Sequence, residues 1–127
     1  MIPIQSDRGC NCGSGPKLTF SCSGAADVGE VADRASRALT TKGSGRMFCL
    51  AGIGDRISAI VKSTESAASI LAIDGCVPDC AGRSLEEAGF KRINHLHLTD
   101  LGVEKGCTEV DPDSFAQVVD KAKIFLS

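Results

Sequence analysis

Seven cysteines in a chain of 127 residues are the clearest candidates for chemistry. No secretory signal is visible at the start of the chain, so we expect a cytoplasmic protein, in which thiols are kept reduced. Disulfide bonds are therefore a poor explanation for these cysteines. Metal binding, thiol chemistry and ordinary core packing remain.

Four of the cysteines stand in, or soon after, short apolar segments that we interpret as strands. They are Cys22, Cys49, Cys76 and Cys80. In a parallel sheet all strands end at the same edge, and open α/β folds bind their ligands there. Thiolates that share one tetrahedral zinc ion lie just under about 4 Å apart, a spacing that neighbouring strands can supply. The pattern predicts zinc binding by these four thiolates at the C-terminal edge of the sheet.

The same positions also suit a reactive thiol. Cys22 and Cys76 precede predicted helices, whose N-termini stabilise a thiolate. An alternative function is therefore a thiol-dependent enzyme for redox or sulfur-transfer chemistry, with one of these two residues as the nucleophile and the other as the resolving thiol. A third hypothesis is a metal sensor or partner-binding module. For Cys49, which has apolar neighbours, and for Cys22, which follows Phe20 in a predicted strand, simple core packing stays open.

The Gly-rich segment 1–16 carries two more cysteines. We expect this segment to be a flexible arm that precedes a single domain over 17–127. Cys10 and Cys12 could complete the metal site, form a second weak site or have no role. Cys107 is expected to be a spare exposed thiol.

Asp74 and the two histidines are candidates for an accessory role. Asp74 lies two residues before Cys76 and could hydrogen-bond a ligand, and the alternative is that it simply caps a helix. His95 and His97 share one face of a predicted strand, from which one imidazole, that of His97, could reach the edge as a ligand. The alternative is that both histidines form the solvated face of an edge strand. Asp100, just after this strand, could also face the edge.

An alternation of apolar segments and helical patterns must position these residues. The predicted strands are 17–22, 47–50, 68–73 and 95–98. The expected helices are a segment that ends at Gly43, one capped by Asp55 with Ile57, Ile60 and Val61 on its inner face, one over about 79–88, and one beginning at Pro112. This order favours a three-layer α/β/α fold around a mainly parallel four-stranded sheet, doubly wound as in Rossmann-like and flavodoxin-like proteins. The expected strand order is 2-1-3-4, with 3-2-1-4 as the alternative.

Charge and hydropathy exclude several partners. The chain has 14 Lys and Arg against 16 Asp and Glu, so it has no polybasic surface for a nucleic-acid backbone. It has no apolar run long enough to span a membrane. A metal ion is the partner that the residues indicate, whereas they specify neither an oligomeric state nor whether the protein is an enzyme.

Three motifs resemble the signatures of the DGC-domain family of small prokaryotic proteins. They are CSGAADVGEVADRA (22–35), MFCLAGIG (47–54) and ILAIDGCVPDCA (70–81). The resemblance implies a zinc-binding domain with four potential chelating cysteines and no known activity. On this chain the four are Cys22, Cys49, Cys76 and Cys80. The family motif often continues Asp-Gly-Cys-Pro, and here Val77 precedes the proline without changing the chelating positions.

Overall fold

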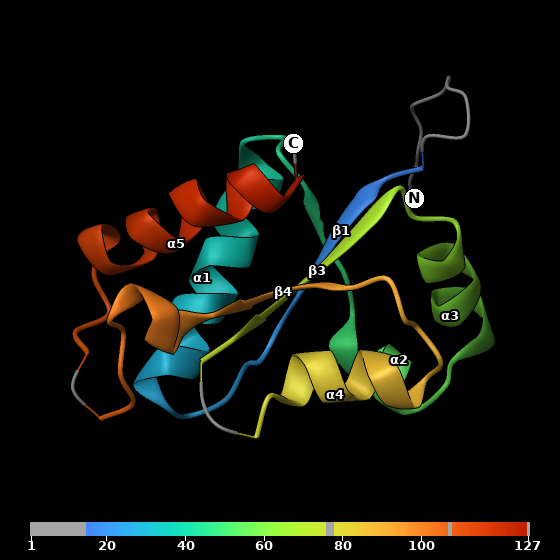
Figure 1. The fold of residues 1–127 in the computed structure, drawn as a ribbon, viewed down its shortest axis with the longest axis horizontal. Helices are drawn as coiled ribbons and strands as arrows, with labels where there is room; N and C mark the ends of the chain where they lie inside the picture. The colour runs from blue at the N-terminus through green and yellow to red at the C-terminus, as the bar shows by residue number, and fades with distance from the viewer. Residues whose placement is uncertain (1–14, 76–77, 107, 127) are drawn as a thin grey trace.

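The computed structural model describes residues 15–75, 78–106 and 108–126. The described chain forms a four-stranded, all-parallel sheet in the order β2-β1-β3-β4, which confirms the predicted topology (Figure 1). Its strands are β1 (Lys17–Ser21), β2 (Arg46–Met47), β3 (Ser69–Asp74) and β4 (Asn94–His97). Central β1 and β3 therefore lie side by side, and β4 is an edge strand.

Helices cover both faces of the sheet. One face carries α1 (Asp27–Thr41) and α5 (Pro112–Leu126), and the other carries α2 (Leu50–Gly54), α3 (Ser58–Glu65) and α4 (Cys80–Glu87). A short 3-10 helix, η2 (Leu98–Leu101), follows β4 directly. The result is the three-layer α/β/α fold that the sequence predicts.

The central strands are buried on both faces, because successive residues point to opposite layers. In β3, Leu71 and Ile73 pack under α1, whereas Ala72 packs against the layer of α2 and α4. Phe20 of β1 joins that second layer. Both faces of the sheet are thus buried, as expected for a parallel sheet that carries helices on both sides.

The connection after β2 differs from the prediction. The predicted strand 47–50 ends early, since Cys49 is already the N-cap of α2. Asp55 does not begin the next helix but closes α2 as its C-cap. Ile57 takes the N-cap position of α3 and is 44% exposed rather than inward-facing. The chain turns at Arg56, whose backbone is left-handed (φ 58°). Its guanidinium donates hydrogen bonds to the carbonyls of Ile53 and Gly54 at the end of α2.

The other helix ends follow the predicted signals. Gly43 and Gly89 adopt positive φ angles directly after the C-caps of α1 and α4, a conformation that glycine reaches without steric cost. Asp111 caps α5 by accepting a hydrogen bond from the backbone N–H of Ser114. Within the described residues, no helix is both long and apolar enough to cross a membrane.

Candidate functional site

The C-terminal edge of the sheet carries a row of polar and sulfur-containing residues. Along the strand order, Cys49 follows β2, Cys22 follows β1, Asp74 ends β3 and His97 ends β4. The parallel topology therefore gathers the strand-end candidates at one edge. Cys76, Cys10, Cys12 and Cys107 lie outside the described residues.

Cys22 extends β1 by one residue and is buried. Its backbone N–H donates to the carbonyl of Ile73 at 3.0 Å. The backbone N–H of Gly75 donates to its Sγ at 3.1 Å. Gly75 is the last described residue before Cys76, so the sulfur of Cys22 lies where the chain leaves β3. A hydrogen bond from an N–H group stabilises a thiolate at this position.

Cys49 and Cys80 stand at the starts of α2 and α4, two helices that pack together. The Sγ of Cys49 accepts a hydrogen bond of 3.4 Å from the backbone N–H of Gly52, and its side chain is exposed. Cys80 is also exposed and lines an open pocket of about 480 Å³ with Arg56 and Arg83. Both sulfurs are thus accessible from solvent, whereas that of Cys22 is not.

Asp74 is the buried centre of the other half of this edge. The residue is 1% exposed, and its side chain accepts hydrogen bonds of 2.9 Å from the backbone N–H groups of Ala81 and Gly82 in the first turn of α4. The same carboxylate lies 2.6 Å from Nε2 of His95. Asp74 therefore caps α4 from outside the helix and also holds an imidazole.

His95 and His97 point toward α4 from the same face of β4, as the alternation along the strand predicts. Their ring centroids lie 4.0 Å apart. The side chains are 25% and 37% exposed. His95 packs directly over the backbone of Gly82, where a Cβ atom would overlap the ring. The face is therefore half-buried beneath α4 rather than simply solvated.

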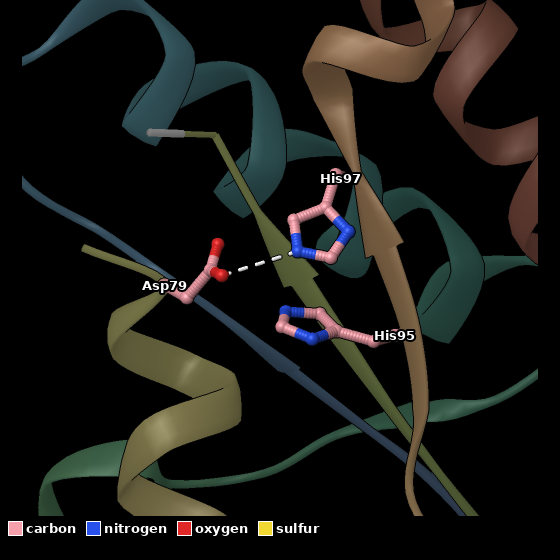
Figure 2. Close-up of side chains that lie close together, drawn as sticks. All are labelled: Asp79, His95 and His97. Carbon is pink, nitrogen blue, oxygen red and sulfur yellow. Dashed lines mark hydrogen bonds and ion pairs between the residues drawn. The ribbon is translucent and has the colours of Figure 1, made fainter. Parts of the chain in front are cut away.

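Asp79 is a residue that sequence reasoning missed. It occupies the N-cap position of α4 with a left-handed backbone (φ 52°, ψ 51°), yet its side chain makes no capping hydrogen bond. Its Oδ2 lies 3.2 Å from Nε2 of His97 (Figure 2). The available signal was the His-x-His pair on an edge strand together with the aspartate just before α4. It was missed because an aspartate before a helix is ordinarily interpreted as a cap.

Asp79, His95 and His97 form a cluster whose ligand atoms all lie within 4.8 Å of one another. It is the one such cluster among the described residues, and the described cysteines are not part of it. The edge therefore has two kinds of donor. Sulfur atoms follow β1 and β2 and begin α4, whereas nitrogen and oxygen atoms lie between β3, β4 and α4.

Asp27, at the start of α1, makes a third set of contacts close to this edge. Its carboxylate accepts hydrogen bonds from the backbone N–H groups of Gly106 and Thr108. These hydrogen bonds are the main reason that the pKa of Asp27 lies below its usual range. They fasten the loop after η2 to the beginning of α1.

Comparison with known proteins assigns the chain to a family. A model of the DGC domain matches residues 18–122, a span that includes all three motifs and both histidines. The chain belongs to the DGC-domain family. Among curated proteins, this DGC domain is similar to the anaerobic and virulence modulator AnvM of Pseudomonas aeruginosa, with 31% identity over 88 residues, which is 69% of this chain and 67% of the relative. No solved structure matches the chain.

Proposed function

We propose that this DGC domain binds a zinc ion through cysteine thiolates at the C-terminal edge of its sheet. The proposed ligands are Cys22, Cys49, Cys76 and Cys80. The observation that carries the proposal is the position of the three described cysteines, each of which lies just after a strand or at the start of a helix on this one edge. Membership of the family supports the same assignment.

The surroundings of the sulfurs suit metal-bound thiolates. Backbone N–H groups donate to the Sγ atoms of Cys22 and Cys49, and Cys80 begins a helix, where the partial positive charge favours an anion. Thiolates are soft ligands that select zinc over hard cations such as Mg²⁺. Four of them would close the coordination sphere and make the ion structural, whereas three would leave a position for a substrate or a partner ligand.

The substitution Cys49→Ser separates metal binding from folding. Serine is a favoured N-cap residue and can accept the hydrogen bond from Gly52, so α2 keeps its cap while the thiolate is lost. We expect the zinc purified with the protein to fall by about one equivalent in Cys49→Ser and Cys80→Ser, measured by inductively coupled plasma mass spectrometry.

Cys107→Ser is the matched control, because it removes a cysteine outside the proposed ligand set. It should retain the zinc content of the parent. Parent protein that holds no zinc, and takes up none on reconstitution, contradicts the proposal.

Alkylation of the parent protein tests the alternative of a thiol-dependent enzyme. A metal-bound thiolate reacts slowly with iodoacetamide and becomes reactive when a chelator removes the ion. Rapid labelling of Cys22 or Cys76 at about pH 6, unchanged by zinc or chelator, would instead indicate a nucleophile of depressed pKa.

A regulatory role is a second candidate, because the curated relative is described as a modulator. In this hypothesis metal occupancy alters how the segment 1–16 or the sheet edge contacts a partner. Limited proteolysis with and without zinc tests it, and identical digestion patterns in the two conditions would contradict a metal-dependent change of the chain.

A further inference from the structure

We propose that Asp79, His95 and His97 form a second cation site, separate from the thiolates and built from nitrogen and oxygen donors. The three side chains come from the N-cap of α4 and from β4, and they converge between these two elements (Figure 2). The cation is a borderline divalent metal such as Zn²⁺, Fe²⁺, Co²⁺ or Mn²⁺. This site goes beyond the proposed thiolate site, since it uses none of the proposed sulfur ligands.

The distances in the cluster already approach those of a metal site. Ligand atoms about 2.0–2.2 Å from a metal lie roughly 3–3.5 Å from one another. Nε2 of His97 and Oδ2 of Asp79 are 3.2 Å apart, and a ring nitrogen of His95 lies within 4.8 Å of both. To share one ion, the three ligand atoms must close the remaining gap of about an ångström.

The side chain of Asp79 does not cap the helix that it precedes. A left-handed conformation costs about 1 kcal/mol for a residue with a Cβ atom, and an ordinary helix start would avoid it. An aspartate at the N-cap position usually accepts a capping hydrogen bond, but here Asp74 caps α4. The strained conformation instead turns the carboxylate of Asp79 toward the histidines.

Asp74 supports the cluster from behind. It fixes the ring of His95 through Nε2 and adds a second, buried negative charge next to the site. Two carboxylates and two neutral imidazoles balance the charge of one divalent ion.

The donor set determines what such an ion could do. Two imidazoles and one carboxylate form the ligand pattern of metal sites that keep open coordination positions. Three protein donors leave room for water or an exchangeable ligand, and the histidines are 25% and 37% exposed. The second site is therefore suited to ligand exchange, in contrast to a closed four-thiolate site.

The test uses Co²⁺ as the probe with the full-length protein. Co²⁺ bound to thiolates has an intense sulfur-to-metal charge-transfer band, whereas Co²⁺ bound to nitrogen and oxygen has only weak d–d bands. We expect Asp79→Asn and His97→Gln to raise the apparent Kd of the ion without the charge-transfer band by at least about 10-fold. Both variants should keep the charge-transfer band.

Asp79→Asn is nearly isosteric, and asparagine tolerates the left-handed conformation, so this variant guards against a folding defect in His97→Gln. Asp100→Asn is the matched control, an exposed acid three residues after His97, and should bind like the parent. Unchanged Co²⁺ stoichiometry and affinity in both Asp79→Asn and His97→Gln would overturn this proposal.

The outcomes for the two sites are distinguishable. Loss of the charge-transfer band in Cys49→Ser, with the second ion retained, supports both proposals. A band-free ion in a parent protein that shows no charge-transfer band at all supports the second site and contradicts the thiolate site. A single ion that disappears in both sets of variants shows one mixed site and overturns the inference of a separate one.

Discussion

The two halves of the sheet's C-terminal edge are organised differently. Between β3, β4 and α4, side chains bond to one another, as in the pairs Asp74–His95 and Asp79–His97. Near β1 and β2, the sulfurs of Cys22 and Cys49 accept hydrogen bonds from backbone N–H groups. The histidine half thus combines contacts between side chains with the backbone N–H bonds that Asp74 accepts from α4, whereas these two sulfurs accept hydrogen bonds from backbone N–H groups.

This difference follows from where the residues come from. Strand register sets Ala72 opposite His95 and Asp74 opposite His97, so the register of two paired strands places the histidines relative to Asp74. The described cysteines come from three separate connections, after β1, after β2 and at the start of α4. The following substitutions probe this contrast.

The largest effect is expected for Asp74→Asn. Asparagine keeps one oxygen acceptor but turns an amide group toward one of the two backbone N–H donors of α4, which leaves a buried donor unpaired. We expect the free energy of unfolding to fall by about 2–3 kcal/mol, measured by urea denaturation. Asp55→Asn, at an exposed carboxylate, is the control and should change stability little. A loss as small as that of the control would show that the histidine half is not held by its buried carboxylate.

A smaller loss is expected for Gly82→Ala. Alanine normally favours a helix by about 0.5–1 kcal/mol. Here its methyl group would overlap the ring of His95. We expect a net destabilisation of about 1–2 kcal/mol and displaced ring resonances of His95 in NMR spectra.

Gly54→Ala is the matched control for this substitution, because a Cβ atom at the end of α2 would meet nothing within 4 Å. It should be neutral or slightly stabilising. Equal changes in the free energy of unfolding for the two alanine variants would mean that α4 does not pack tightly against the ring of His95.

The smallest effect is expected for Asp27→Asn, at the start of α1. Like Asp74, Asp27 accepts hydrogen bonds from backbone N–H groups, but these contacts are partly exposed, so their loss should cost less. Amide hydrogen exchange of Gly106 and Thr108 should become faster in the variant, while exchange in β3 stays unchanged.

The lowered pKa of Asp27 also sets the pH dependence of this effect. Because the folded state favours the ionised carboxylate, its contribution is fully present above the ordinary pKa of about 3.9 and is lost as the pH falls through the lowered value. The urea midpoints of parent and Asp27→Asn should therefore differ at about pH 7 and converge at strongly acidic pH. A difference that persists in acid would contradict a role for the ionised carboxylate.

Much of the fold could be predicted because its signals are local. The strand-helix alternation and the glycines at helix ends depend on neighbours in the chain, and the structure confirms them. The turn at Arg56 was missed because its guanidinium also donates to the carbonyl of Glu87 in α4, a partner that only the folded chain brings near.

The sequence by itself determined which residue types arrive at the sheet edge and in what order, because parallel strands must all end on one side. It also placed both histidines on one face, because side chains alternate along a strand. Only the tertiary structure decided that Asp74 caps α4 and that Asp79 faces His97. Those contacts join segments that meet only when α4 packs against β3 and β4, so neither residue spacing nor residue type specifies them in advance.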